Sequence, residues 1–197
     1  MKLYDLTLSG NCYKVRLFAA LANIDLTLVA VDFMAGEHKS AEMLALNPFG
    51  EIPILVDDKI VLRDAQAILV YLAHRYGGEA WWLGEAHLQG EVVQWLSVAA
   101  NEIQHGPNTA RLIEKFNAPK DKHRAIAQSK QILTLLEQHL SANSWLAAGR
   151  PTIAECAVFP YVALAEEGRI SLAAYPKVNE WLLRVKQLPN FVAMPGV

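Results

Sequence analysis

The feature that most constrains this fold is the point at which strand-like runs stop. Short apolar runs bounded by turn residues occur before Gly78 and do not occur after it. Beyond Gly78, apolar residues recur at helical spacing. A chain of 197 residues is long enough for two small domains. The sequence therefore predicts an α/β domain over residues 1–76, a linker over 77–86 and an all-helical domain over 87–197.

The first domain is expected to follow the order β-α-β-α-β-β-α. Its first two strands flank a helical stretch, which predicts a parallel pair with a right-handed crossover. Its last two strands flank a tight polar turn, which predicts a hairpin. The final helix should bury a face that includes Tyr76 and should stop at Gly77-Gly78. The expected strands of this four-stranded mixed sheet are residues 2–8, 26–31, 54–56 and 60–62.

The second domain is expected to contain only helices. Thr152 and Glu155 have the spacing of a capping box, in which each side chain satisfies a free backbone N–H at a helix start. Pro176 is placed to open the last helix, since a proline at the first helical position loses no hydrogen bond. We expect Trp95, on a long amphipathic helix, to belong to the core.

Charge and cysteine content exclude several classes of function. The formal net charge is −2, whereas a protein that binds nucleic acid needs a strong basic excess. We find no basic run for an anionic membrane surface, no signal pattern and no apolar run long enough to span a bilayer. Two distant cysteines and scattered histidines predict neither a disulfide scaffold nor a metal site. A cytoplasmic location is expected.

Four features of the first domain point to one ligand, although each has a simpler explanation. Ser9 begins a helix, where free N–H groups favour anions, but a serine there is often only an N-cap. Ile52-Pro53 precedes a strand, and a cis bond would expose the Ile52 backbone, but most X-Pro bonds are trans. Asp64 stands at another helix start and could be a plain N-cap. His38-Lys39 could be a solvated charge pair.

In this order and spacing, the four features resemble the cytosolic glutathione transferase superfamily, in its serine-type classes such as theta, delta and phi. The resemblance covers essentially the whole chain. It implies a thioredoxin-like first domain, a helical second domain and glutathione as co-substrate. The stretches that carry it are Ser9-Gly-Asn-Cys-Tyr-Lys-Val-Arg-Leu, Gly36-Glu-His-Lys-Ser, Asn47-Pro-Phe-Gly-Glu-Ile-Pro, Asp64-Ala-Gln-Ala-Ile-Leu, Thr152-Ile-Ala-Glu and Tyr175-Pro-Lys-Val-Asn-Glu-Trp.

The resemblance also implies a role for individual residues. Ser9 would donate a hydrogen bond to the glutathione sulfur, and Asn11 would support it as a second donor. Ile52, before cis-Pro53, would pair with the backbone of the cysteinyl residue. Asp64 would lie near the γ-glutamyl amine. His38 and Lys39 would face the glycine carboxylate.

Two residues depart from the family pattern. Ala65 stands where a serine hydroxyl is usual, and the loss of one charge-assisted hydrogen bond weakens binding by about 1.5–3 kcal/mol. Glu51 stands where Gln or Lys is usual, and it would repel the glycine carboxylate. These departures favour one rival hypothesis, a non-catalytic scaffold that binds other proteins. Cys12 suggests another rival, glutathione-dependent peroxide or disulfide reduction, although its helical position favours a covered thiol.

A second site for a small hydrophobic electrophile is expected between the domains. The expected lining is Leu8, Asn101, His105 and Arg111, although each of the last three could simply belong to a polar exposed face. A homodimer is implied by the family resemblance alone.

Overall fold

The structure is a computed structural model that describes residues 1–197. The first domain contains a four-stranded sheet in the order β2-β1-β3-β4, in which β1 and β2 are parallel and the other two pairs are antiparallel. The predicted order of elements is confirmed. The strands are β1 (Lys2–Asp5), β2 (Thr27–Ala30), β3 (Ile54–Asp57) and β4 (Ile60–Arg63). The helices are α1 (Gly10–Leu21), the 3₁₀ turn η1 (Glu37–Lys39), α2 (Ala41–Leu46) and α3 (Ala65–Tyr76).

Two details of this domain differ from the prediction. The first strand ends at Asp5 rather than at residue 8, because a turn follows in which the Ser9 N–H donates to the Leu6 carbonyl at 2.9 Å. Tyr76 is 41% exposed rather than buried with the face of α3. Its hydroxyl donates to the Asp57 carboxylate beside the hairpin, and this contact holds the ring at the surface.

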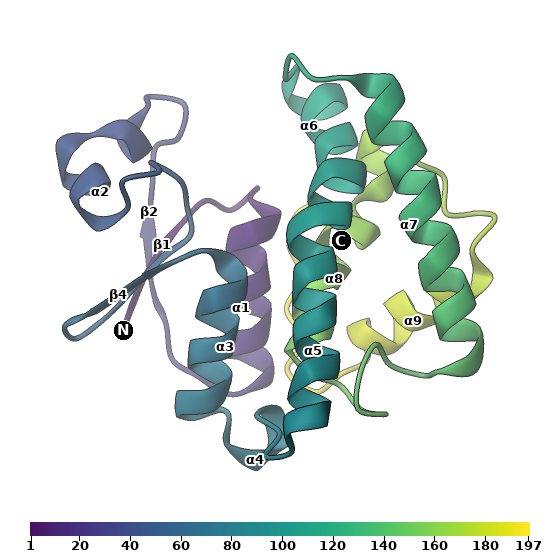
Figure 1. The fold of residues 1–197 in the computed structure, drawn as a ribbon. Helices are drawn as coiled ribbons and strands as arrows, with labels where there is room; N and C mark the ends of the chain where they lie inside the picture. Colours follow the sequence, from purple (N-terminus) through teal and green to yellow (C-terminus); the bar gives the residue numbers. More distant parts are fainter.

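The second domain is helical throughout (Figure 1). A short helix, α4 (Gly78–Trp81), falls inside the predicted linker over 77–86. The elements that follow are α5 (Ala86–Val98), the π-helical segment η2 (Ala99–Asn108), α6 (Thr109–Phe116), α7 (Lys122–Ala142), α8 (Ile153–Ala163), the 3₁₀ turn η3 (Ala165–Gly168) and α9 (Pro176–Lys186). The predicted capping box at Thr152 and the opening of the last helix at Pro176 are both confirmed.

One hydrophobic core joins the two domains. In it α1 and α3 pack against α8, a helix whose residues from Ile153 to Val162 are all buried (Figure 1). A smaller apolar cluster of Val31, Met43 and Ile54 lies apart from this core, in the first domain. No helix has the length and apolar character needed to cross a membrane.

Candidate functional site

The sheet brings the predicted site residues to one of its ends. Because β1 and β3 are antiparallel, β1 ends where β3 begins, and the hairpin returns β4 to the same end. The turn before Ser9, the Ile52–Pro53 pair and Asp64 therefore lie at the same end of the sheet. The parallel strand β2 also ends there and leads to η1, which carries His38–Lys39. Residues that are far apart in the sequence are thus brought to the same end of the sheet.

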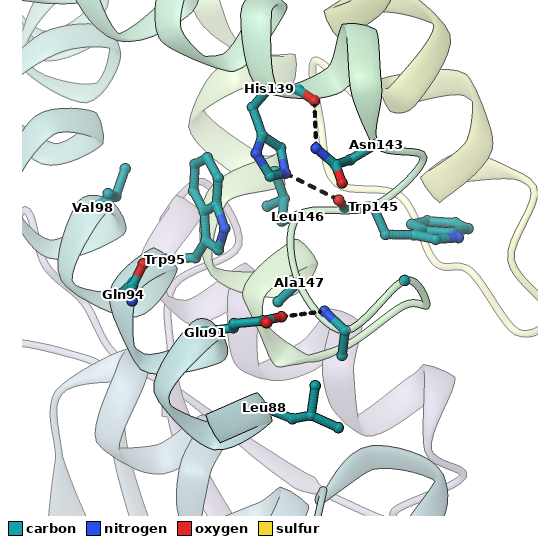
Figure 2. A pocket seen from close by; sticks show the side chains of 12 residues that line it. Leu88, Glu91, Gln94, Trp95, Val98, His139, Asn143, Trp145, Leu146 and Ala147 are labelled. Carbon is teal, nitrogen blue, oxygen red and sulfur yellow. Dashed lines mark hydrogen bonds between the residues drawn. The ribbon is translucent and has the colours of Figure 1, made fainter. Parts of the chain in front are cut away.

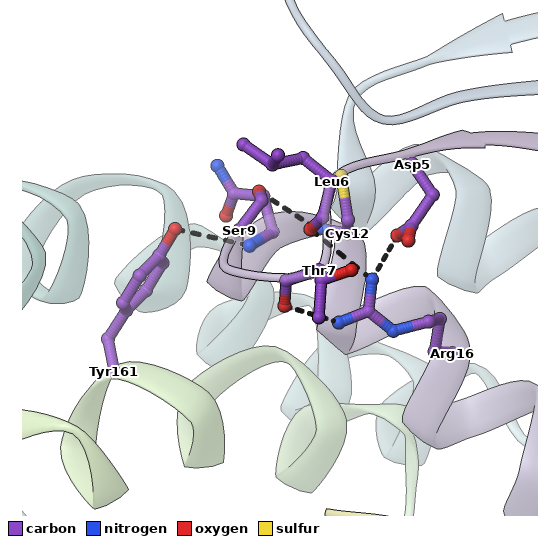
Figure 3. Close-up of polar contacts among 8 residues, drawn as sticks. Asp5, Leu6, Thr7, Ser9, Cys12, Arg16 and Tyr161 are labelled. Carbon is purple, nitrogen blue, oxygen red and sulfur yellow. Dashed lines mark hydrogen bonds and ion pairs between the residues drawn. The ribbon is translucent and has the colours of Figure 1, made fainter. Parts of the chain in front are cut away.

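Ser9 is the N-cap of α1. Its hydroxyl oxygen accepts a hydrogen bond from the Cys12 N–H at 3.2 Å (Figure 3). A hydroxyl that accepts in this way keeps its own proton free for another acceptor. The side chain also lies where the helix dipole favours negative charge. This position can therefore hold an anion by both a donated hydrogen bond and the dipole.

Tyr161 of α8 reaches the same helix start from the other domain. Its hydroxyl accepts a hydrogen bond from the Asn11 N–H at 3.1 Å (Figure 3). This approach depends on Gly10, because a Cβ atom there would lie 2.6 Å from Cζ of the tyrosine ring. Burial raises the pKa of Tyr161, so the phenol stays neutral. The second domain therefore fixes the start of α1.

Two arginines hold the turn that leads to Ser9. Arg16 of α1 forms an ion pair with Asp5 and donates to the Thr7 carbonyl at 3.0 Å (Figure 3). Arg111 of α6 donates to the Leu8 carbonyl at 3.1 Å and to Glu167 at 2.5 Å. The Arg111 side chain is almost fully buried and paired, so it lies behind this turn rather than on an open pocket wall.

The loop before β3 exposes a backbone edge. The Ile52–Pro53 bond is cis, and neither the N–H nor the C=O of Ile52 makes a hydrogen bond within the chain. Buried Asn47 shapes this loop: its side chain donates to the Glu51 carbonyl at 2.7 Å and accepts from the Phe49 N–H at 3.1 Å. The Ile52 backbone is therefore free to pair with an extended ligand.

Asp64 is the N-cap of α3, which is the simpler of the two roles that the sequence allows for it. One carboxylate oxygen accepts from the N–H groups of Gln66 and Ala67, both at 3.0 Å. Its φ of 72° is uncommon for a residue other than glycine, and backbone strain of this kind concentrates at functional sites. Ala65, which follows, is buried and contributes no side-chain hydrogen bond.

The remaining predicted ligand contacts lie around η1 and the loop before β3. The His38 ring stacks on Phe33 at 3.8 Å between centroids, and its Nδ1 is buried without a hydrogen-bond partner. Burial and the neighbouring Lys39 charge lower the pKa of His38, so the ring is neutral. Lys39 donates to the Phe49 carbonyl at 3.0 Å, and the Glu51 side chain is exposed.

Cys12 lies inside α1 and is fully buried. Burial raises the pKa of its thiol to about 11, so the sulfur is protonated at neutral pH. Since the thiolate is the reactive form of cysteine, Cys12 is poorly suited to act as a nucleophile.

Asn101 and His105 lie on η2 with exposed side chains. Asn101 donates to Glu102 at 3.1 Å, and neither residue makes a hydrogen bond to the Ser9 turn. The described contacts therefore do not join these two residues to the rest of the candidate site.

Sequence reasoning missed Tyr161 and Lys14. No sequence signal points to Tyr161, because its contact depends on how the domains dock. Lys14 did carry a signal, since it is a cation within the apolar stripe of α1. It is fully buried, and its ammonium has no hydrogen-bond partner and lies 5.2 Å from the centroid of the Tyr161 ring.

The burial of Lys14 predicts a pH-dependent stability. Burial lowers its pKa from 10.5 to about 7, against the opposing charge of Asp64. Between these values the unfolded chain holds a proton that the folded chain lacks, so stability rises with pH across this window. An unpaired buried charge is costly, so Lys14→Met should stabilise the protein by about 1–3 kcal/mol near pH 6.5. The stabilisation by Lys14→Met should be smaller at about pH 9.5, where the buried amine of the parent protein is neutral.

Urea unfolding at both pH values measures this effect. Lys130→Met, which removes an exposed lysine, is the matched control and should change little. An equal gain for Lys14→Met at both pH values would contradict the assignment.

Comparison with known proteins gives the family. Residues 3–80 match the glutathione S-transferase N-terminal domain, and residues 119–184 match the glutathione S-transferase C-terminal domain. Glutathione S-transferase 3 of Zea mays is 32% identical, over 97% of this chain and 91% of its own. Disulfide-bond oxidoreductase YfcG of Escherichia coli is 29% identical, over 91% of this chain and 87% of its own. A crystal structure of glutathione S-transferase from Pseudomonas fluorescens has a TM-score of 0.92 and 29% identity, and the match covers 98% of both chains.

The fold and the sheet-end residues define a thioredoxin-like protein with a helical second domain. With these matches over nearly its full length, the chain belongs to the cytosolic glutathione S-transferase superfamily.

Proposed function

We propose that this protein is a serine-type glutathione transferase, which activates glutathione as a thiolate for attack on small hydrophobic electrophiles. The observation that supports this most directly is the Ser9 hydroxyl at the start of α1. Its oxygen already accepts from the Cys12 N–H, so its proton is available to a sulfur anion. Ser9 acts as a donor and does not itself ionise, and the nucleophile belongs to glutathione.

The energies involved are sufficient for this role. A free thiol has a pKa of about 8.5. A hydrogen bond to a charged group contributes about 1.5–3 kcal/mol, and a helix N-terminus adds about 0.3–1 kcal/mol. Since about 1.4 kcal/mol corresponds to one pH unit, these contributions make the thiolate the main form at neutral pH.

The other site residues would orient the tripeptide. In this proposal the Ile52 backbone pairs with the cysteinyl residue, and the second carboxylate oxygen of Asp64 receives the γ-glutamyl amine. His38 and Lys39 face the glycine carboxylate, and exposed Glu51 has room to turn away from it. The electrophile would bind at the domain junction beside Leu8, where Arg111 acts from behind the turn as a positioning residue.

The test is glutathione conjugation of aryl halides and epoxides by Ser9→Ala. Loss of a hydrogen bond to the thiolate should lower kcat/KM about tenfold to a hundredfold and raise the pKa of bound glutathione, read from thiolate absorbance against pH. The matched control is Cys12→Ala, three residues further along the same helix, which should keep its activity. Equal activity of Ser9→Ala and the parent protein would remove Ser9 from its assigned role.

A second candidate is glutathione-dependent disulfide reduction, which the resemblance to an oxidoreductase favours. The thiolate of bound glutathione would attack a disulfide, breaking its S–S bond to give a mixed disulfide and a released thiolate. A second glutathione would resolve the mixed disulfide to oxidised glutathione, and Cys12 would take no part. Disulfide reduction that exceeds conjugation, with Cys12→Ala unaffected, would favour this candidate. Calorimetry that detects no binding at millimolar glutathione would instead favour the non-catalytic scaffold.

A further inference from the structure

A cavity within the helical domain shares no residue with the candidate site around Ser9. It has a volume of about 560 Å³ and lies between α5, the end of α7 and the loop that follows α7 (Figure 2). This volume is within the range of small-molecule sites, which is about 300–1,000 Å³. No residue of the first domain lines it. A ligand bound here would not occupy the candidate glutathione site.

Seven of the twelve residues that line this cavity are apolar. Trp95, expected in the core, is only partly buried, and its indole packs edge-on against the His139 ring at 4.9 Å between centroids (Figure 2). The His139 Nε2 atom lies 3.2 Å from the Trp145 carbonyl oxygen, which can only accept, so this nitrogen carries a proton. These contacts fix the indole as one wall. The remaining apolar lining is Leu88, Val98, Trp145, Leu146, Ala147 and Ala148.

One exposed carboxylate, that of Glu91, borders the cavity. An oxygen of Glu91 accepts from the Ala148 N–H at 3.0 Å, which leaves the second oxygen without a partner in the chain (Figure 2). Ala148 and Gly149 have φ values of 54° and 64°, and this left-handed bend accompanies the turn of the Ala148 N–H toward Glu91. A left-handed alanine is uncommon, and such strain concentrates at ligand sites.

No cationic side chain forms an ion pair with Glu91, and neither lysine nor arginine lines the cavity. A negative group beside an aromatic ring is the arrangement that attracts organic cations, through Coulomb attraction and through the face of the indole. It disfavours anions, including glutathione.

We propose that this cavity is a second binding site, for a small aromatic amine in its protonated form. The ammonium group contacts the free oxygen of Glu91, and the ring of the ligand packs against the Trp95 indole. The proposal does not depend on the glutathione transferase activity, because the two sites share no residue.

The experiment titrates the full-length protein with 2-phenylethylammonium, 2-phenylethanol and 3-phenylpropionate, and follows the Trp95 indole N–H by NMR. The ammonium ion should shift this signal and should bind at least about tenfold more tightly than the alcohol, with the carboxylate weakest. Equal affinities for the ammonium ion and the alcohol would overturn the proposal.

Two variants test the assigned groups. Glu91→Gln keeps an acceptor for the Ala148 N–H but removes the charge, so it should lower ammonium affinity about tenfold and leave alcohol binding unchanged. The matched control is Glu85→Gln, the same change at an exposed position just before α5, which should bind like the parent protein. Trp95→Leu should weaken binding of both ligands. An unchanged ammonium affinity in Glu91→Gln, or competition between ammonium and glutathione, would overturn the assignment.

Discussion

Replacing Glu155 with alanine should lower the free energy of unfolding by about 3–5 kcal/mol. Glu155 is fully buried at the start of α8, the helix on which both domains pack. Its carboxylate accepts from the Thr152 N–H and the Leu146 N–H, both at 2.7 Å, and from the Thr152 hydroxyl at 3.0 Å. Alanine would leave two buried N–H groups without an acceptor. Urea unfolding measures the loss, and a loss below about 1 kcal/mol would contradict it.

Glu155→Gln is the matched control, since it keeps one acceptor oxygen at nearly constant volume, and it should lose less stability than Glu155→Ala. The two proteins should also differ in pH dependence. Burial raises the pKa of Glu155 from 4.5 to about 7, against the opposing hydrogen bonds. The contribution of the neutral Glu155 carboxyl to the free energy of unfolding is fully present below about pH 4.5 and is lost as the pH rises through about 7. The parent protein should therefore lose stability relative to Glu155→Gln across this window.

Gly10→Ala should disrupt both the domain junction and the candidate site around Ser9. The new Cβ atom would lie 2.6 Å from Cζ of the buried Tyr161 ring, so the ring or α1 must move. Overpacking of this kind costs about 1–3 kcal/mol or more, and we expect about 3 kcal/mol here. The movement also breaks the hydrogen bond between Asn11 and Tyr161, so glutathione conjugation should fall at least about tenfold. Thermal unfolding and steady-state kinetics measure the two effects.

Gly84→Ala is the matched control, because a Cβ atom at Gly84 meets no other atom within 4 Å. A second test adds Tyr161→Leu to Gly10→Ala, since the smaller side chain gives room to the new methyl group. The double variant should be more stable than the sum of the two single losses predicts. If the loss of stability in the double variant equalled the sum of the two single losses, the methyl group at residue 10 and the Tyr161 ring would not collide.

The sequence predicted this fold well where the information is local. Strands show as short apolar runs, and helices show by their period and by caps such as the Thr152–Glu155 box. The first strand was predicted too long because residues 6–8 are as apolar as a strand, and only the hydrogen bond from Ser9 back to Leu6 reveals the turn. The π-helical segment η2 was not predicted, since hydrophobic spacing does not resolve one wide turn within a long helix.

In the candidate site, too, residues at local sequence boundaries could be predicted, whereas residues that depend on long-range contacts could not. Ser9, Ile52–Pro53 and Asp64 could be proposed from the sequence because each lies at a strand-helix or loop-strand boundary that the sequence marks. Tyr161 was missed, and Arg111 was expected as lining rather than as support, because their contacts join residues 150 and 103 positions apart. Contacts of this range depend on how α6 and α8 dock against the first domain, and no local pattern encodes that docking.

The two long-range hydrogen bonds at the start of α1 have a consequence for how this protein loses function. Both come from the helical half of the chain, so the geometry around Ser9 is a property of the assembled molecule and not of the thioredoxin-like half alone. Damage to the interface between the halves should therefore abolish the proposed transferase activity before the sheet itself unfolds. The proposed activity should thus report on assembly of the whole chain.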